Sequence, residues 1–191
     1  GGVLGPPRPL RKPRLELPKT RNVVTVSDKA QVINVCNTLM VRSGAFGVDM
    51  EWPVAEGAPA GRVATIQIST PEREYVVHLR HIAYGVEKKT LPDELWSFLL
   101  NPTPKKVGHC LPADIKRLGR DYPEHACRIP REFPGVVELC DIATPRLGKM
   151  RKGGRVKKRS LVELGMDVLG KDLPKPSHLR KSTRWGLEKL D

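Results

Sequence analysis

The sequence lacks any long apolar run. No stretch of the 191 residues approaches the roughly 20 consecutive apolar residues that a membrane-spanning helix requires. The opening segment is rich in Pro, Arg and Lys, and it has no apolar centre of the kind found in secretory signal peptides. We therefore expect a soluble, intracellular protein without a membrane partner.

Cysteine is also scarce, and its spacing excludes two common uses. The four cysteines include no Cys-x-x-Cys pair, and no His follows them at zinc-ligand spacing. This pattern favours reduced thiols in a protein that is not secreted, and it argues against a structural zinc site. The cysteines are Cys36, Cys110, Cys127 and Cys140.

Positive charge, by contrast, is in excess, with a formal net charge of +13 at pH 7. Residues 1–21 contain six basic residues (Lys or Arg) and one acidic residue. Residues 22–143 contain 14 basic and 15 acidic residues, and residues 144–191 contain 14 basic and five acidic residues. A near-neutral body between two basic segments predicts contact with a polyanion such as nucleic acid. A solubilising tail is the alternative, and it suits the first segment better than the last. Residues 1–21 are expected to be disordered or extended, and residues 22–191 are expected to form the domain.

The order of the expected elements indicates an α/β fold with a mixed sheet. Three successive strands joined by short turns predict an antiparallel meander, and strands then alternate with helices. A loop is expected over residues 120–135, where three prolines fall. The expected strands include residues 23–26, 46–52, 63–69, 75–79 and 107–110, and helices are expected after Asp28, Pro92 and Ser160 and around Asp114.

The most informative segment is Phe46-Gly47-Val48-Asp49-Met50-Glu51-Trp52, which is typical of a half-buried strand. Strand side chains alternate between faces, so Asp49 and Glu51 point the same way, about 7 Å apart along the strand. Two carboxylates at that spacing suit a shared hard divalent cation. The alternative is an ordinary antiparallel strand with one solvated face. Trp52 falls on the apolar face, which favours core packing over stacking on a base.

A third acid follows a second short strand. In the segment from Val107 to Leu118 a strand ends at Gly108, the chain turns, and Asp114 stands in the first turn of the next helix. An acid there is also favoured by the helix dipole alone. Taken by itself, this segment favours a structural acid over a metal ligand.

Together the two segments resemble the DEDD superfamily of 3′→5′ exonucleases, most closely the exonuclease domain of the Werner helicase family. Residues 46–53 resemble the first exonuclease motif, and Val-Gly-x5-Asp-x3-Leu over residues 107–118 resembles the second. Similarity extends over roughly residues 23–190. The resemblance implies an RNase H-like fold, in which three antiparallel strands are followed by parallel strands and flanked by helices. It also implies action on DNA or RNA 3′ ends, with a helicase domain or helicase partner as a further possibility.

One family motif is missing. The third exonuclease motif, Tyr-x3-Asp, should follow Trp185, but the sequence contains no Tyr beyond Tyr122, and Leu187 stands four residues before Asp191. The chain also begins at Gly1, with its first Met at Met40. We therefore expect a domain that is incomplete at its C-terminal end, within a longer reading frame, and whose own activity is doubtful.

The resemblance also implies the chemistry of the site. Phosphodiester hydrolysis would use two Mg²⁺ or Mn²⁺ ions, with Asp49 bridging both, Glu51 on the water-activating ion and Asp114 on the other. A catalytically inactive nucleic-acid-binding module of the same fold is the alternative. Another RNase H-like nuclease, such as an integrase, fits the motif spacing less well.

A basic run near the C-terminal end is the candidate nucleic-acid contact. Flexible Lys and Arg clusters release counterions when they bind phosphates. The same run resembles a nuclear-localisation cluster, which would place the protein in the nucleus, and a solvated surface loop is the third reading. Its basic residues are Arg151, Lys152, Arg155, Lys157, Lys158 and Arg159.

Overall fold

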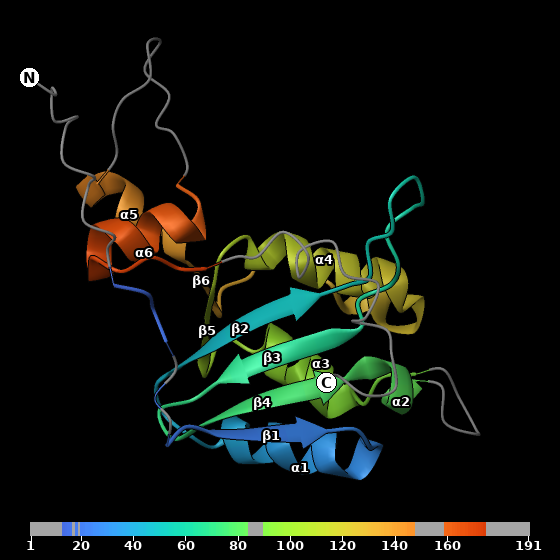
Figure 1. Ribbon diagram of the computed structural model, residues 1–191. Coiled ribbons are helices and arrows are strands. Elements are labelled where there is room, and N and C mark those ends of the chain that lie inside the picture. The colour runs from blue at the N-terminus through green and yellow to red at the C-terminus, as the bar shows by residue number, and fades with distance from the viewer. Residues whose placement is uncertain (1–12, 17, 19, 84–89, 148–158, 175–191) are drawn as a thin grey trace, which may run out of the picture.

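The computed structural model describes residues 13–16, 18, 20–83, 90–147 and 159–174, which form a six-stranded sheet with helices around it (Figure 1). No helix in these described residues is long and apolar enough to cross a bilayer. The strands are β1 (Asn22–Val26), β2 (Ala45–Glu51), β3 (Thr65–Ser69), β4 (Arg73–His78), β5 (Lys105–Gly108) and β6 (Val136–Glu138). The helices are α1 (Lys29–Met40), α2 (Leu79–Ala83), α3 (Asp93–Leu100), α4 (Leu111–Asp121), α5 (Leu139–Leu147) and α6 (Leu161–Leu169), with a 3-10 helix at Pro123–Arg128.

The sheet combines an antiparallel half and a parallel half, which confirms the predicted RNase H-like fold class. Its strand order is β1-β4-β3-β2-β5-β6. Strands β2, β3 and β4 pair antiparallel as a meander, while β5 and β6 continue the sheet in parallel from β2. Strand β1 pairs in parallel with β4 at the other edge. Strand β2 therefore lies where the two halves meet.

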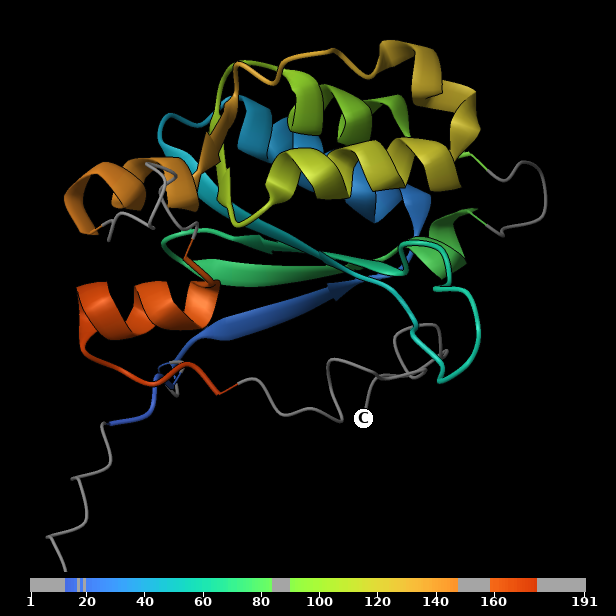
Figure 2. The same cartoon turned by 90° about the horizontal axis from the view of Figure 1, so that it is seen from above.

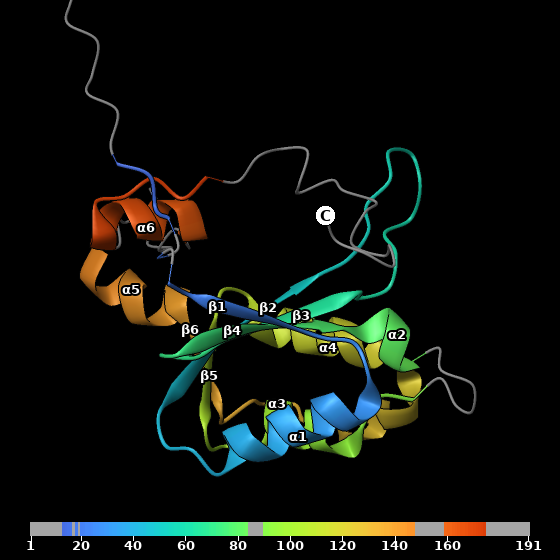
Figure 3. The same ribbon diagram turned by 60° about the horizontal axis from the view of Figure 1, so that its bottom comes forward.

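Helices α1, α3 and α4 cover one face of the sheet, and α5 and α6 lie beside its β6 end (Figures 2 and 3). The covered face contains the core. Along β2, the side chains of Phe46, Val48 and Met50 are 1%, 4% and 3% exposed, whereas Asp49 between them is exposed. The alternation therefore places the β2 acids on the face opposite the three packed helices.

The helix ends follow the local chemistry that the sequence predicts. The Asp28 carboxylate accepts a hydrogen bond from the backbone N–H of Gln31 at 2.8 Å, which caps α1. Ser160 and Glu163 form a reciprocal capping box at the start of α6. Helix α6 ends before Gly170, which has a φ of +64° and so uses the conformational freedom of glycine.

One expectation needs correction. Residues 120–135 are not simply a loop, because α4 continues to Asp121 and the 3-10 helix follows it.

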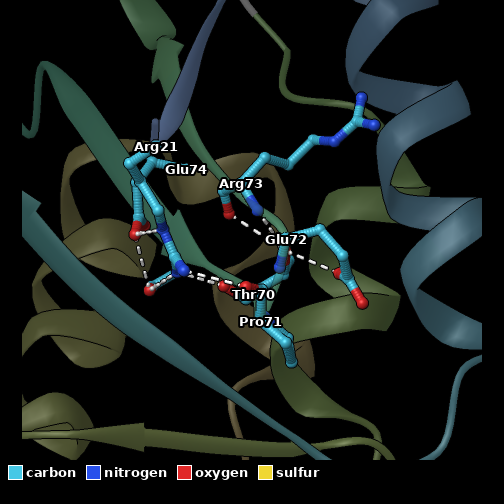
Figure 4. A network of polar contacts seen from close by, with 7 residues as sticks. Arg21, Thr70, Pro71, Glu72, Arg73 and Glu74 are labelled. Atoms are coloured by element: carbon cyan, nitrogen blue, oxygen red, sulfur yellow. Dashed lines mark hydrogen bonds and ion pairs between the residues drawn. The ribbon is translucent and has the colours of Figure 1, made fainter. Parts of the chain in front are cut away.

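Arg21, directly before β1, contacts a distant turn of the sheet. Its guanidinium binds the Glu74 carboxylate at 2.8 Å and the Pro71 carbonyl at 2.8 Å, and it also donates to the Thr70 carbonyl (Figure 4). These contacts join the start of β1 to the β3–β4 turn. Residues 1–12 lie outside the described residues.

Gly108 provides a test of the close packing between β5 and β2. A Cβ at this position would lie 2.7 Å from the Val48 carbonyl oxygen and 2.9 Å from the Leu111 Cβ. We expect Gly108→Ala to lower the free energy of unfolding by about 1–3 kcal/mol. The control is Gly165→Ala in α6, where the atoms nearest to an added Cβ are 3.6 Å away. Because Ala has a higher helix propensity than Gly, this change should raise the free energy of unfolding by about 0.5–1 kcal/mol. Urea unfolding of the two variants measures both effects, and equal stability would contradict the packing argument.

Candidate active site

Strand β2 carries the first two candidate acids. Asp49 is exposed and Glu51 is half-buried, and their register partners on β3 are Gln67 and Thr65. One oxygen of the Asp49 carboxylate accepts a hydrogen bond from the Met50 N–H at 3.0 Å. Both acids are thus held by a central strand whose other face is packed in the core.

The third acid reaches the same region through strand β5. This strand pairs in parallel with β2, so that Val107 lies opposite Gly47. The chain then turns at Cys110, whose φ of +63° is left-handed, and α4 begins at Leu111. Asp114 therefore stands in the first turn of a helix that starts at the end of β5, next to β2.

The charges of the acids on β2 and β6 act on the Asp114 carboxyl. Burial, followed by the charges of Asp49, Glu51 and Glu138, raises the pKa of Asp114 from 3.8 to about 7. The positive charge of Arg117 acts in the opposite direction. Because neighbouring carboxylates repel each other, the ionised cluster is costly unless a cation offsets its charge.

Glu138 is the acid that sequence reasoning missed. It is half-buried at the end of β6, where its register partner is Gly108, and it accepts a long hydrogen bond of 3.4 Å from the Cys140 N–H. The available signal was its position at the end of a strand parallel to β5, since the ends of adjacent parallel strands meet at one edge of a sheet. The sequence does not predict the pairing of β6 with β5, and the position of Glu138 at this edge of the sheet depends on that pairing.

The donor set suits a hard divalent cation, because carboxylate oxygens are the ligands that Mg²⁺ and Mn²⁺ prefer. The side-chain positions do not by themselves define a metal centre. Within the described part of the chain, no three His, Cys, Asp or Glu side chains form a group that could hold a metal ion. The metal-ligand roles of Asp49, Glu51 and Asp114 therefore stay predictions.

A hollow of about 250 Å³ lies beside Asp49. Leu139 on α5 and Leu161 on α6 border it. Its polar lining comes mainly from β2, β3 and the residue that follows β5. The lining residues include Gly47, Asp49, Gln67, Ser69, Gly108, His109, Leu139 and Leu161.

Arg159 is the one residue of the basic run that falls in the described residues, and Arg151, Lys152, Arg155, Lys157 and Lys158 lie outside them. Its guanidinium forms an ion pair with Asp167 on α6. Its carbonyl accepts hydrogen bonds from His109 Nε2 at 2.9 Å and from the Cys140 thiol at 3.0 Å. The backbone that ends the basic run is therefore attached directly to the residue that follows β5.

Comparison with known proteins agrees with this geometry. The family model described as 3′-5′ exonuclease matches residues 23–184, and the chain belongs to that family. A curated 3′-5′ exonuclease of Drosophila willistoni is 30% identical over 168 residues, which is 87% of this chain and 42% of the relative. The chain thus spans about two fifths of the length of the curated relatives that it matches.

Solved structures show the same fold. The Nibbler EXO domain of Aedes aegypti superposes with a TM-score of 0.67 at 18% identity, covering 93% of this chain and 80% of that one. The EXD2 exonuclease domain has a TM-score of 0.52 at 28% identity, covering 89% and 78%. The EXD2 domain soaked in Mn matches with a TM-score of 0.52 at 27% identity, covering 89% and 78%.

The raised pKa of Asp114 predicts how the stability of the metal-free protein depends on pH. Because the pKa is raised in the folded state, that state binds a proton between about pH 4 and 7 that the unfolded chain has released, so stability falls as the pH rises through this range. Asp114→Asn removes the effect. We expect the free energy of unfolding of this variant, relative to that of the wild type, to increase by roughly 1 kcal/mol from pH 5 to pH 8, after allowance for the partial solvent exposure of Asp114. The corresponding increase in relative melting temperature is about 2–4 °C.

The matched control is Asp93→Asn on α3, which removes an exposed carboxylate paired with Arg128. Its melting temperature should follow that of the wild type across the same pH range. A constant difference between Asp114→Asn and the wild type at every pH would contradict the proposed carboxylate repulsion.

Proposed function

We propose that this chain is the nuclease domain of a metal-dependent 3′→5′ exonuclease that hydrolyses phosphodiester bonds at nucleic-acid 3′ ends. The observation that carries the proposal is the placement of the three acids on an exonuclease-type sheet: Asp49 and Glu51 lie on β2, and Asp114 lies in the first turn of the helix that follows the adjacent strand β5. Burial, followed by the charges of Asp49 and Glu51, raises the pKa of Asp114. Family membership supports the reaction class. The activity and substrate of the whole protein are part of the proposal, because the chain spans less than half of its curated relatives.

The three carboxylates are the residues that would hold Mg²⁺ or Mn²⁺. The chemistry that a bound pair of such ions supplies is activation of the attacking water and stabilisation of the leaving 3′-oxygen. The EXD2 exonuclease domain has been solved after soaking in Mn, which supports the same choice of cation here. The Asp49 and Glu51 carboxylates are fixed by β2, while Asp114 is brought in by α4, so the protein supplies ligands from two separate elements.

The hollow beside Asp49 is the proposed position of the terminal nucleotide. Gln67 and Ser69 line this hollow and offer hydrogen-bonding groups. The basic run at residues 151–159 is the proposed phosphate contact, because Arg159 is attached to His109 at the border of this hollow.

A catalytically inactive nucleic-acid-binding module is the second candidate. It is favoured by one observation, namely that the described acids do not form a group of three around a common point. The closer relation to the Werner type, a helicase partner and a nuclear location are also part of the proposal. DNA and RNA are both open as substrates.

Nuclease activity provides the direct test. We expect Mg²⁺ or Mn²⁺ to support release of single nucleotides from a 5′-labelled oligonucleotide. Asp49→Asn should lower the rate about a hundredfold or more, because metal ligation supplies several kcal/mol to the transition state. The control is Asp93→Asn, the same chemical change on the far face of the sheet. Binding of the oligonucleotide without any nucleotide release in either metal would support the inactive module instead.

Salt dependence tests the proposed phosphate contact. For single strands, the logarithm of the binding constant falls with the logarithm of salt concentration by about 0.7 per neutralised phosphate. Replacing the six Lys and Arg residues of positions 151–159 with Gln should reduce this slope and weaken binding at low salt. The comparison variant replaces the Lys and Arg residues of positions 8–19 with Gln. An unchanged slope in the first variant would remove the basic run from the proposal.

A further inference from the structure

Arg117 on helix α4 holds the segment that connects β2 to β3. Its guanidinium carbon lies 4.1 Å from the centroid of the Trp52 ring, which follows directly after Glu51. One of its terminal nitrogens donates to the Gly61 carbonyl at 2.6 Å. Its Nε lies 3.4 Å from the Asp121 carboxylate, an ion-pair distance, and its side chain is only 19% exposed. One side chain thus contacts both ends of the connecting segment.

Asp121, the last residue of α4, and Tyr122, which follows it, strengthen this attachment. The Asp121 carboxylate accepts a hydrogen bond from the Val63 N–H at 3.0 Å, and the Tyr122 hydroxyl donates to the Val63 carbonyl at 2.8 Å. An acid in the last turn of a helix is unfavourable for the helix dipole. Asp121 is nevertheless largely buried there, which indicates that its contacts to Arg117 and Val63 offset that cost.

The same face of α4 carries a candidate metal ligand. Asp114, Arg117 and Asp121 are spaced at i, i+3 and i+7, so they form one stripe along the helix. The first member lies in the site, and the other two contact the β2–β3 connection. Two backbone hydrogen bonds also join the start of that connection to its end. The Gly61 N–H donates to the Pro53 carbonyl, and the Ala64 N–H donates to the Glu51 carbonyl, both at 2.8 Å.

We propose that Arg117 is a positioning residue, which fastens the Trp52–Val63 connection to α4 and thereby fixes Glu51 relative to Asp114. The proposal rests on the exonuclease function proposed above. In this arrangement the stack on Trp52 fixes the end of β2, and the hydrogen bond to Gly61 fixes the return of the chain toward β3. Arginine suits both contacts because its planar guanidinium stacks on aromatic rings while its N–H groups donate in the same plane.

The test compares Arg117→Met with Arg120→Met. Arg120 is a matched control, because it lies on the same helix and pairs with the same Asp121 carboxylate at 3.2 Å, but its side chain is 66% exposed. Two quantities are measured: amide hydrogen exchange of residues 53–63, and the dissociation constant for Mn²⁺ by calorimetry. We expect Arg117→Met to accelerate exchange in this segment and to weaken Mn²⁺ binding about tenfold, as is typical of residues that orient metal ligands. Arg120→Met should change neither.

The direction of the Mn²⁺ effect separates positioning from simple electrostatics. Removing a positive charge beside Asp114 should by itself strengthen cation binding, so a weaker affinity can come only from misplaced ligands. Arg117→Lys keeps the charge but loses the planar group, and it should also weaken Mn²⁺ binding. Unchanged or tighter binding in Arg117→Met would overturn the proposal.

A second variant addresses the other side of the stack. Trp52→Leu should produce the same faster exchange and weaker Mn²⁺ binding, and the double variant should lose no more affinity than the more affected single variant. Full additivity would overturn the proposal. A wild-type chain that binds no Mn²⁺ would contradict the proposed function, and the exchange comparison between Arg117→Met and Arg120→Met would then decide the attachment by itself.

Discussion

The alternation of side chains along β2 is the constraint on which the rest of the structure depends. Phe46, Val48 and Met50 are almost fully buried on one face, so a slip of one residue in register would move Asp49 into the core and expose these apolar groups. Neighbouring strands on both sides enforce that register, antiparallel on β3 and parallel on β5. The position of the first two acids is therefore a consequence of core packing.

Those features that depend on local chemistry were predictable from the sequence. The meander, the cap at Asp28, the capping box at Ser160 and the helix around Asp114 all follow from patterns within a few residues, and each is present. The sequence also predicted the elements that carry the three candidate acids, two on one strand and the third in the first turn of a helix after a short strand. What the sequence did not provide is their mutual geometry.

Features that depend on contacts between distant segments could not be predicted in this way. Strand β1 pairs with β4, some 50 residues away, and Arg21 reaches the β3–β4 turn across a similar separation. The charge of Glu138 acts on Asp114 because β6 pairs with β5, and no local pattern reveals that pairing. Strand pairing is specified by the packing of whole faces, so it emerges only once the sheet is assembled.

In the candidate site, cation binding and carboxylate repulsion have opposite requirements for the distance between the acids, and helix α4 carries one of these acids. Acids that bind a cation must be close together, yet their proximity and burial raise the pKa of Asp114 and destabilise the ionised state. Contacts near the end of the same helix, made by Arg117, Asp121 and the following residue Tyr122, hold the β2–β3 connection. Because α4 carries both Asp114 and Arg117, a movement of the whole helix away from β2 would also strain the contacts that hold the strand carrying Glu51. Stability elsewhere in the domain thus maintains a cluster of charges that would be unfavourable in isolation.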